Sequence, residues 1–244
     1  MIRSPDICKM KPMNKKVILL LETATSACSV ALCEAGEVIA VKEVNERNIH
    51  ASLLTLFIDE VMKIGGKKYS DLDAVAVSRG PGSYTGLRIG VSTAKGLCYA
   101  LDIPLISVDT LEAMAYGILK QEKIHASSFL IPMIDARRME VYTAIYKADL
   151  SLIEPVTAKI VDSNTFDHYE DNRLILFGDG SYKFQEVFAG RSFIRFLGFE
   201  NSAAHLGYLA NKKLSNGDIE NVAYFEPFYL KEFLAGKPGN FPQT

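Results

Sequence analysis

The sequence is poor in the features that mark metal, redox and hydrolase centres. Its four cysteines, Cys8, Cys28, Cys33 and Cys98, form no CxxC pair, which predicts buried free thiols in a reducing compartment rather than a zinc or disulfide framework. Its four histidines form neither HxxxH nor HExxH, so we expect no zinc site and no tightly held metal in the purified protein. No GxSxG elbow occurs either.

Clustered positive charge is also scarce. The 244 residues carry a formal net charge of −2 with a pI of about 6.1. A protein that gripped RNA through its phosphates alone would need a longer basic stripe, so we expect any contact with nucleic acid to be indirect. The basic residues gather only in pairs, at Lys67-Lys68, Arg137-Arg138 and Lys212-Lys213.

Long hydrophobic runs are absent. Residues 1–16 carry charges and no apolar segment, and the run that begins at Val17 is interrupted by Glu22 and by polar residues after it. This pattern predicts neither a signal peptide nor a membrane span, and therefore a cytoplasmic protein without membrane contact. We expect residues 1–14 to form a flexible extension.

Hydrophobic periodicity predicts an α/β protein built from two similar halves. In the first half we expect strands over 17–21, 28–33, 37–44, 74–77 and 105–108, and helices over 50–64, 87–101 and 110–120. In the second half we expect strands over 129–134, 140–146, 156–161 and 174–177, and a closing helix over 202–214.

The two halves echo each other in element order. A strand, an acid, a polar turn and a second strand follow one another both in VILLLETATSACSVALC and in FLIPMIDARRMEVYTAIY. Later in each half, a strand runs into a glycine loop, in AVAVSRGPGSYTG and in ILFGDGSYKF. This order predicts a duplicated α/β unit, with a three-strand meander opening each lobe and a cleft between them. We place the lobes at 15–120 and 121–244, with the C-terminal tail packing back on the first.

Glu22 and Asp135 are the acids that end the first strand of each half. At the carboxyl ends of strands they would face one cleft, where paired carboxylates could hold a metal–phosphate complex or act as acid and base. Capping of the following turn through backbone N–H groups is an equally good interpretation. Thr25 and Ser26 in the first turn could cradle phosphate, although Ala24 stands where glycine would be wanted.

The segment SRGPGSYTGLR over residues 78–88 is rich in glycine. Its glycines allow unusual backbone angles, and Ser83 with the following helix N-terminus offers donors for an anion. It is not a Walker A loop, and a strand-to-helix turn remains the alternative. The weak nucleotide-binding candidates are thus Glu22, Thr25, Ser26, Gly80, Gly82, Ser83, Asp135 and Gly178.

The helices predicted over 50–64 and 87–101 carry more apolar and small residues than one core face requires. They are either buried on both sides within one lobe or form an interface with a partner, which in the free protein would be a second copy. We expect Ala94 to face that partner rather than the core. The candidate interface residues are Leu53, Leu56, Phe57, Met62, Ile89, Gly90, Ala94 and Leu97.

At LETATSACSVAL and SRGPGSYTGLRIGVSTAKGL the chain resembles the TsaB family, also called YeaZ. The chain also resembles conserved segments of that family at DARRMEVY, FGDG and PFYLK. The similarity extends over residues 17–231. The resemblance implies the duplicated ribonuclease-H-like lobes shared by actin, heat-shock chaperones and sugar kinases.

The resemblance also implies a non-catalytic partner role. The TsaB family pairs with a catalytic paralogue, TsaD, and with the ATPase TsaE, to place threonylcarbamoyl on adenosine 37 of tRNAs that read codons beginning with A. TsaD-like paralogues carry a metal-binding HxxxH whose positions fall here at Thr110 and Met114, which argues against transferase or peptidase activity of this chain alone. Tight nucleotide binding is not expected, and weak ATP or ADP binding with magnesium would act mainly through the complex. The alternative is a nucleotide-dependent phosphotransferase or ATPase that uses the cleft.

Overall fold

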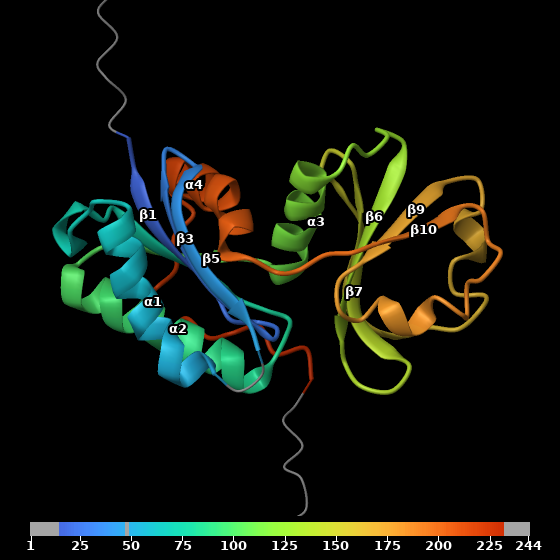
Figure 1. Cartoon of the computed structure of the whole chain (residues 1–244), viewed down its shortest axis with the longest axis horizontal. Coiled ribbons are helices and arrows are strands. Elements are labelled where there is room, and N and C mark those ends of the chain that lie inside the picture. Colours follow the sequence, from blue (N-terminus) through green and yellow to red (C-terminus); the bar gives the residue numbers. More distant parts are fainter. Residues whose placement is uncertain (1–14, 47–48, 232–244) are drawn as a thin grey trace, which may run out of the picture.

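The computed structural model describes residues 15–46 and 49–231, so the extension expected over residues 1–14 lies outside the described residues. Two lobes form, each around a five-stranded sheet (Figure 1). The first sheet has the order β3-β2-β1-β4-β5 and the second β10-β9-β6-β7-β8. The first-lobe strands are β1 Val17–Glu22, β2 Ala27–Glu34, β3 Glu37–Asn45, β4 Ala74–Ser78 and β5 Leu105–Val108; the second-lobe strands are β6 Ser128–Asp135, β7 Glu140–Lys147, β8 Leu152–Ile160, β9 Arg173–Phe177 and β10 Ile194–Leu197.

The predicted duplication is confirmed by strand pairing. β1, β2 and β3 form an antiparallel meander, and so do β6, β7 and β8. In each sheet the opening strand also pairs in parallel with a later strand, β1 with β4 and β6 with β9. The carboxyl ends of these parallel strands therefore lie at one edge of each sheet, the position where α/β folds commonly place their sites.

Helices cover both faces of the first sheet because the side chains of β1 alternate between its faces. Leu19 and Leu21 pack with α1 (His50–Ile64) and α2 (Tyr84–Leu101), whereas Ile18 and Leu20 pack with α4 (Gly207–Asn216) on the other face (Figure 1). Helix α3 (Thr110–Gln121) contacts β6 and β7 of the second sheet. The chain thus returns to the first lobe through α4 after building the second.

Four elements differ from the prediction by more than one residue. Helix α2 begins three residues earlier, since Ser83 is its N-cap and accepts from the Gly86 N–H at 3.2 Å. Strand β8 begins at Leu152 rather than 156, and β10 was not predicted because it is short and only half-buried. The closing helix is split into a 3₁₀ turn over Ala203–Leu206 and α4, which ends where Gly217 adopts φ 72°.

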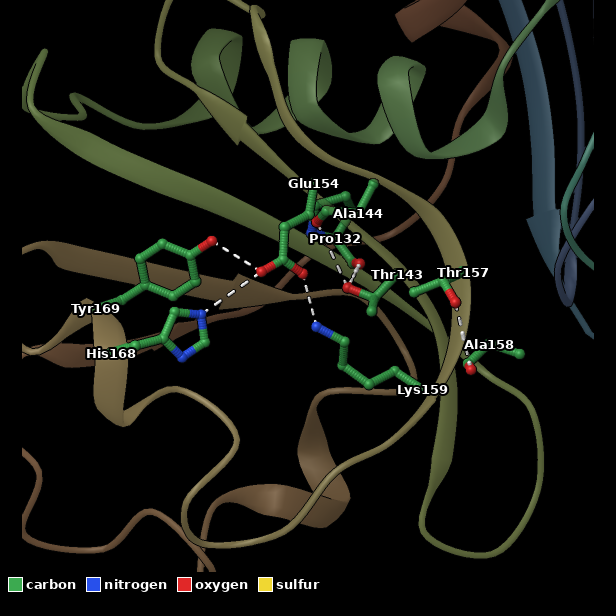
Figure 2. A network of polar contacts seen from close by, with 9 residues as sticks. All are labelled: Pro132, Thr143, Ala144, Glu154, Thr157, Ala158, Lys159, His168 and Tyr169. Carbon is green, nitrogen blue, oxygen red and sulfur yellow. Dashed lines mark hydrogen bonds and ion pairs between the residues drawn. The ribbon is translucent and has the colours of Figure 1, made fainter.

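A polar network anchors the edge strand β8 (Figure 2). The Glu154 carboxylate accepts hydrogen bonds from Lys159 Nζ at 2.6 Å and from the Tyr169 hydroxyl at 2.8 Å, and His168 Nε2 lies 3.6 Å away. Although burial opposes it, these donors hold the pKa of Glu154 below its usual value. The network ties β8 to the 3₁₀ turn over Asp167–Tyr169.

The C-terminal tail runs from α4 along the first lobe and reaches the second. The Glu220 N–H donates to the Leu105 carbonyl at 2.8 Å, which adds a bridge at the edge of β5, and Phe225 enters the core with α1 and α2. The Phe228 N–H then donates to the Arg79 carbonyl at 2.7 Å, and Lys231 pairs with Glu140 of β7. The tail therefore connects the two lobes directly.

Candidate functional site

Glu22 caps the turn that follows β1. Its side chain is 1% exposed, and Oε1 accepts the Ala24 N–H at 2.6 Å. Burial raises the pKa of this carboxyl to about 7, against the opposing effect of that hydrogen bond. The turn-capping interpretation is confirmed for Glu22 by this hydrogen bond, and the expectation that its carboxylate faces the cleft is wrong, because the residue is almost completely buried.

This buried acid should make stability depend on pH. The folded chain holds a proton on Glu22 up to about pH 7, whereas the unfolded chain releases it near pH 4.5. The stability that this proton confers is therefore complete at low pH and is lost as the pH rises towards and through 7. We expect Glu22→Gln to gain about 2–3 kcal/mol relative to the parent between pH 5 and pH 8. Urea unfolding of both proteins at the two pH values measures this gain, and a stability difference that stays constant with pH would refute it.

Asp135 ends β6 in the same way in the second lobe. Its Oδ1 accepts the Arg137 N–H at 3.1 Å, two residues on, as Glu22 does for Ala24. Unlike Glu22 it is exposed, and it forms an ion pair with Lys183 at 2.6 Å. The Asp135 N–H donates to Asp179 Oδ1 at 3.0 Å. The predicted site residues do not include Asp179, although the FGDG segment that contains it is part of the family resemblance.

A small cavity lies at the boundary between the lobes, beside the first acidic turn. Thr25 and Ser26 of the first lobe meet Asp179 and Asn201 of the second around a cavity of about 30 Å³. Small-molecule pockets span roughly 300–1,000 Å³, and a cavity of this size holds about one water molecule. The structure therefore brings Thr25, Ser26 and the Asp135 region to one boundary between the lobes, with little room there.

The glycine-rich loop packs against the chain itself. A Cβ at Gly82 would lie 2.2 Å from the Ala24 carbonyl oxygen, and one at Gly80, whose φ is 113°, would lie 2.6 Å from the Phe228 carbonyl oxygen. The Ser83 N–H donates to the Ala24 carbonyl at 2.7 Å. The backbone N–H groups of Ser83, Gly86 and Ala24 are thus engaged within the fold.

Thr110 and Met114 are both used in packing at the start of α3. The Thr110 hydroxyl is fully buried and accepts the Gly80 N–H at 3.1 Å. Met114 lies in the core beside Gly178. A Cβ added at Gly178 would come within 2.5 Å of the Met114 Cε and 2.4 Å of the Met133 carbonyl oxygen. Gly178, with φ 95°, is therefore required by close packing. Within residues 15–46 and 49–231, no three His, Cys, Asp or Glu side chains gather as a metal site.

The candidate interface residues divide between core and surface. Leu56 on α1 is 55% exposed, and Leu53, Ile89 and Leu97 are half-buried. Ala94 is 0% exposed and belongs to the first-lobe core, so the expectation that it faces a partner is wrong. The other residues of the set that are buried in the lobe are Phe57, Met62 and Gly90.

Comparison with known proteins identifies the family. A family model described as TsaD, tRNA N6-adenosine threonylcarbamoyltransferase, matches residues 41–224. The TsaB protein of Haemophilus influenzae is 38% identical over 130 residues, 53% of each chain, so the chain spans about half the length of that relative. The TsaB protein of Buchnera aphidicola subsp. Baizongia pistaciae is 28% identical over 223 residues, 89% of this chain and 99% of the relative.

A solved structure titled YeaZ from Pseudomonas aeruginosa has the same fold. Its TM-score is 0.76 at 24% identity, over 88% of this chain and 100% of that one. The duplicated ribonuclease-H-like architecture expected from the sequence is confirmed. Over the described ranges, no helix is both long and apolar enough to cross a membrane. With the family model matched over most of the chain and curated TsaB relatives aligned to it, the chain belongs to the TsaB (YeaZ) branch of the TsaD-like family.

Proposed function

We propose that this chain acts in the cytoplasm as a non-catalytic partner subunit in the biosynthesis of threonylcarbamoyladenosine on tRNA. The observation that carries the proposal is the packing of Thr110 and Met114. The positions where TsaD-like paralogues would place metal-binding histidines hold a hydroxyl bonded to Gly80 and a thioether in the core. Neither residue is available to bind a catalytic metal, so chemistry at this position would belong to a paralogue.

The proposed partners are a TsaD-like catalytic paralogue and a TsaE-like ATPase, with tRNA reached only through the complex. The modified position would be adenosine 37 of tRNAs that read codons beginning with A. The exposed apolar residues of α1 and α2, centred on Leu56, would supply the surface for the paralogue, or for a second copy when the chain is alone.

Complex formation with the TsaD-like protein of the same organism tests this partner role. We expect the two purified chains to co-elute in size-exclusion chromatography as one species, at the expense of any homodimer. Separate elution at micromolar concentrations of both proteins would count against the proposed pairing.

Nucleotide binding separates the proposal from the phosphotransferase alternative. The Gly82 backbone packs directly against the Ala24 carbonyl, which leaves no room for a phosphate between them. We therefore expect isothermal titration of the free chain with ATP and magnesium to show no saturable binding. An Ala24→Gly variant provides the comparison, since it removes the methyl group from this turn. Micromolar binding and ATP turnover by the parent chain would support the alternative instead.

A further inference from the structure

A cavity of about 420 Å³ lies between the two lobes, away from the acidic turns. Arg79 after β4, together with Asp109 and Glu112 at the start of α3, forms its charged side. Tyr146 of β7 and Leu152 of β8 line the opposite side, and the tail contributes Phe228. Its volume falls within the range of small-molecule sites.

The charged side of this cavity carries a carboxylate with no hydrogen-bonded or ion-paired partner among the described residues. Arg79 donates from Nε and Nη2 to the two oxygens of Asp109 at 2.8 and 3.1 Å, so these two charges neutralise each other. Glu112 is half-buried, and in the described part of the chain its carboxylate makes no hydrogen bond or ion pair. Burial and the nearby Asp109 raise the pKa of Glu112, while the charges of Lys213, Lys212 and Arg79 act in the opposite direction. Of these three cations, Lys213 is itself paired with Asp218 at 3.1 Å and Arg79 with Asp109. A half-buried carboxylate without a partner is costly.

The other walls are apolar and open to solvent. Leu152 is 53% exposed and Phe228 is 37% exposed. The Phe228 ring lies 5.8 Å from the Arg79 guanidinium, which shows that a cation is accommodated against that ring. The backbone of both walls is fixed, since Phe228 is bonded to Arg79 through its N–H and β8 is held by the Glu154 network (Figure 2).

We propose that this interlobe cavity binds an alkylguanidinium or alkylammonium group, with the charge beside Glu112 and the alkyl chain between Leu152 and Phe228. A neutral ligand would leave the Glu112 carboxylate unpaired, and an anion would be repelled by it. A cation satisfies the carboxylate, and its apolar stem covers the exposed walls. The group can come from a free small molecule or from an arginine or lysine side chain of a partner protein.

Chemical-shift titration of the full chain with propylguanidinium, and with its neutral isostere propylurea, tests the site. We expect propylguanidinium to bind at least about tenfold more tightly, the contribution of one charge-assisted hydrogen bond. Glu112→Gln should abolish this preference. The matched control Glu170→Gln should keep it, because Glu170 is exposed and lies on the second lobe away from the cavity. Equal affinity for the two probes in the parent chain, or an undiminished preference in Glu112→Gln, would overturn the proposal.

The complex with the TsaD-like paralogue distinguishes the two sources of the cation, and this step alone rests on the proposed function. If a partner side chain fills the cavity, the complex excludes propylguanidinium and Glu112→Gln weakens the complex about tenfold. If the site serves a free ligand, the complex binds propylguanidinium as the free chain does. A failure of the two proteins to associate bears on the proposed function and leaves the titration of the free chain standing.

Discussion

Gly86→Ala is expected to lower the free energy of unfolding by about 3 kcal/mol, the upper range for an overpacked core. Gly86 lies in the first turn of α2, where a Cβ would come within 2.1 Å of the Thr23 carbonyl oxygen. That oxygen belongs to backbone directly after β1, which pairs with strands on both sides and cannot retreat. A domain of this size should lose roughly 6–12 °C in melting temperature.

Gly96→Ala is the matched control on the same helix. Gly96 is exposed, and apart from its chain neighbours and the backbone of its own helix no described atom lies within 4 Å of the position that its Cβ would take. Alanine in this environment should stabilise the helix by up to about 1 kcal/mol. Thermal melts of the two variants compare the effects directly. Similar shifts for both would show that the loop does not approach the Thr23–Ala24 turn as closely as described.

Ala94→Arg should unfold the first lobe, whereas Leu56→Arg should leave it folded and remove the partner. Ala94 is fully buried among the core residues of α2, so a long charged side chain there costs several kcal/mol in overpacking and unpaired charge. Leu56 is more than half exposed, and substitutions at such positions change stability by about 0.5 kcal/mol. Burying the arginine of Leu56→Arg in an interface would weaken the complex by at least tenfold.

Circular dichroism and co-elution with the paralogue, measured on both variants, separate these outcomes. Loss of folded signal is expected only for Ala94→Arg, and loss of co-elution without loss of fold only for Leu56→Arg. A folded Ala94→Arg chain would contradict the described core. If the Leu56→Arg chain still binds its partner, the interface does not include this face of α1.

Ala94 belongs to the buried stripe of α2 and not to its exposed surface. Leu87, Val91, Ala94 and Cys98 recur at helical spacing and form the buried stripe of α2. This periodicity was available from the sequence, but the small size of Ala94 favoured an interface instead. The strands were predicted closely because β1 and β4 are continuous apolar runs, which are typical of strands buried on both faces.

Other features could not be predicted because they join distant parts of the chain. Gly82 and Gly86 are required by the turn at Thr23 and Ala24, about sixty positions earlier, and no local pattern reveals that contact. Asp109 meets Arg79 across thirty positions, and the cavity beside them is completed by β8 and by the tail. The acids Glu22 and Asp135 were found from their places after β1 and β6, yet only the structure distinguishes the buried one from the exposed one.

Reconstitution of tRNA modification tests the proposed partner role most directly. The assay supplies unmodified tRNA, threonylcarbamoyl-adenylate and the TsaD-like and TsaE-like proteins of the same organism, and measures threonylcarbamoyladenosine by mass spectrometry. We predict that product formation requires this chain, falls to background when it is omitted, and is absent when it replaces the TsaD-like protein. Product made by this chain without the paralogue, or product made in full without this chain, would contradict the assignment of a non-catalytic partner subunit.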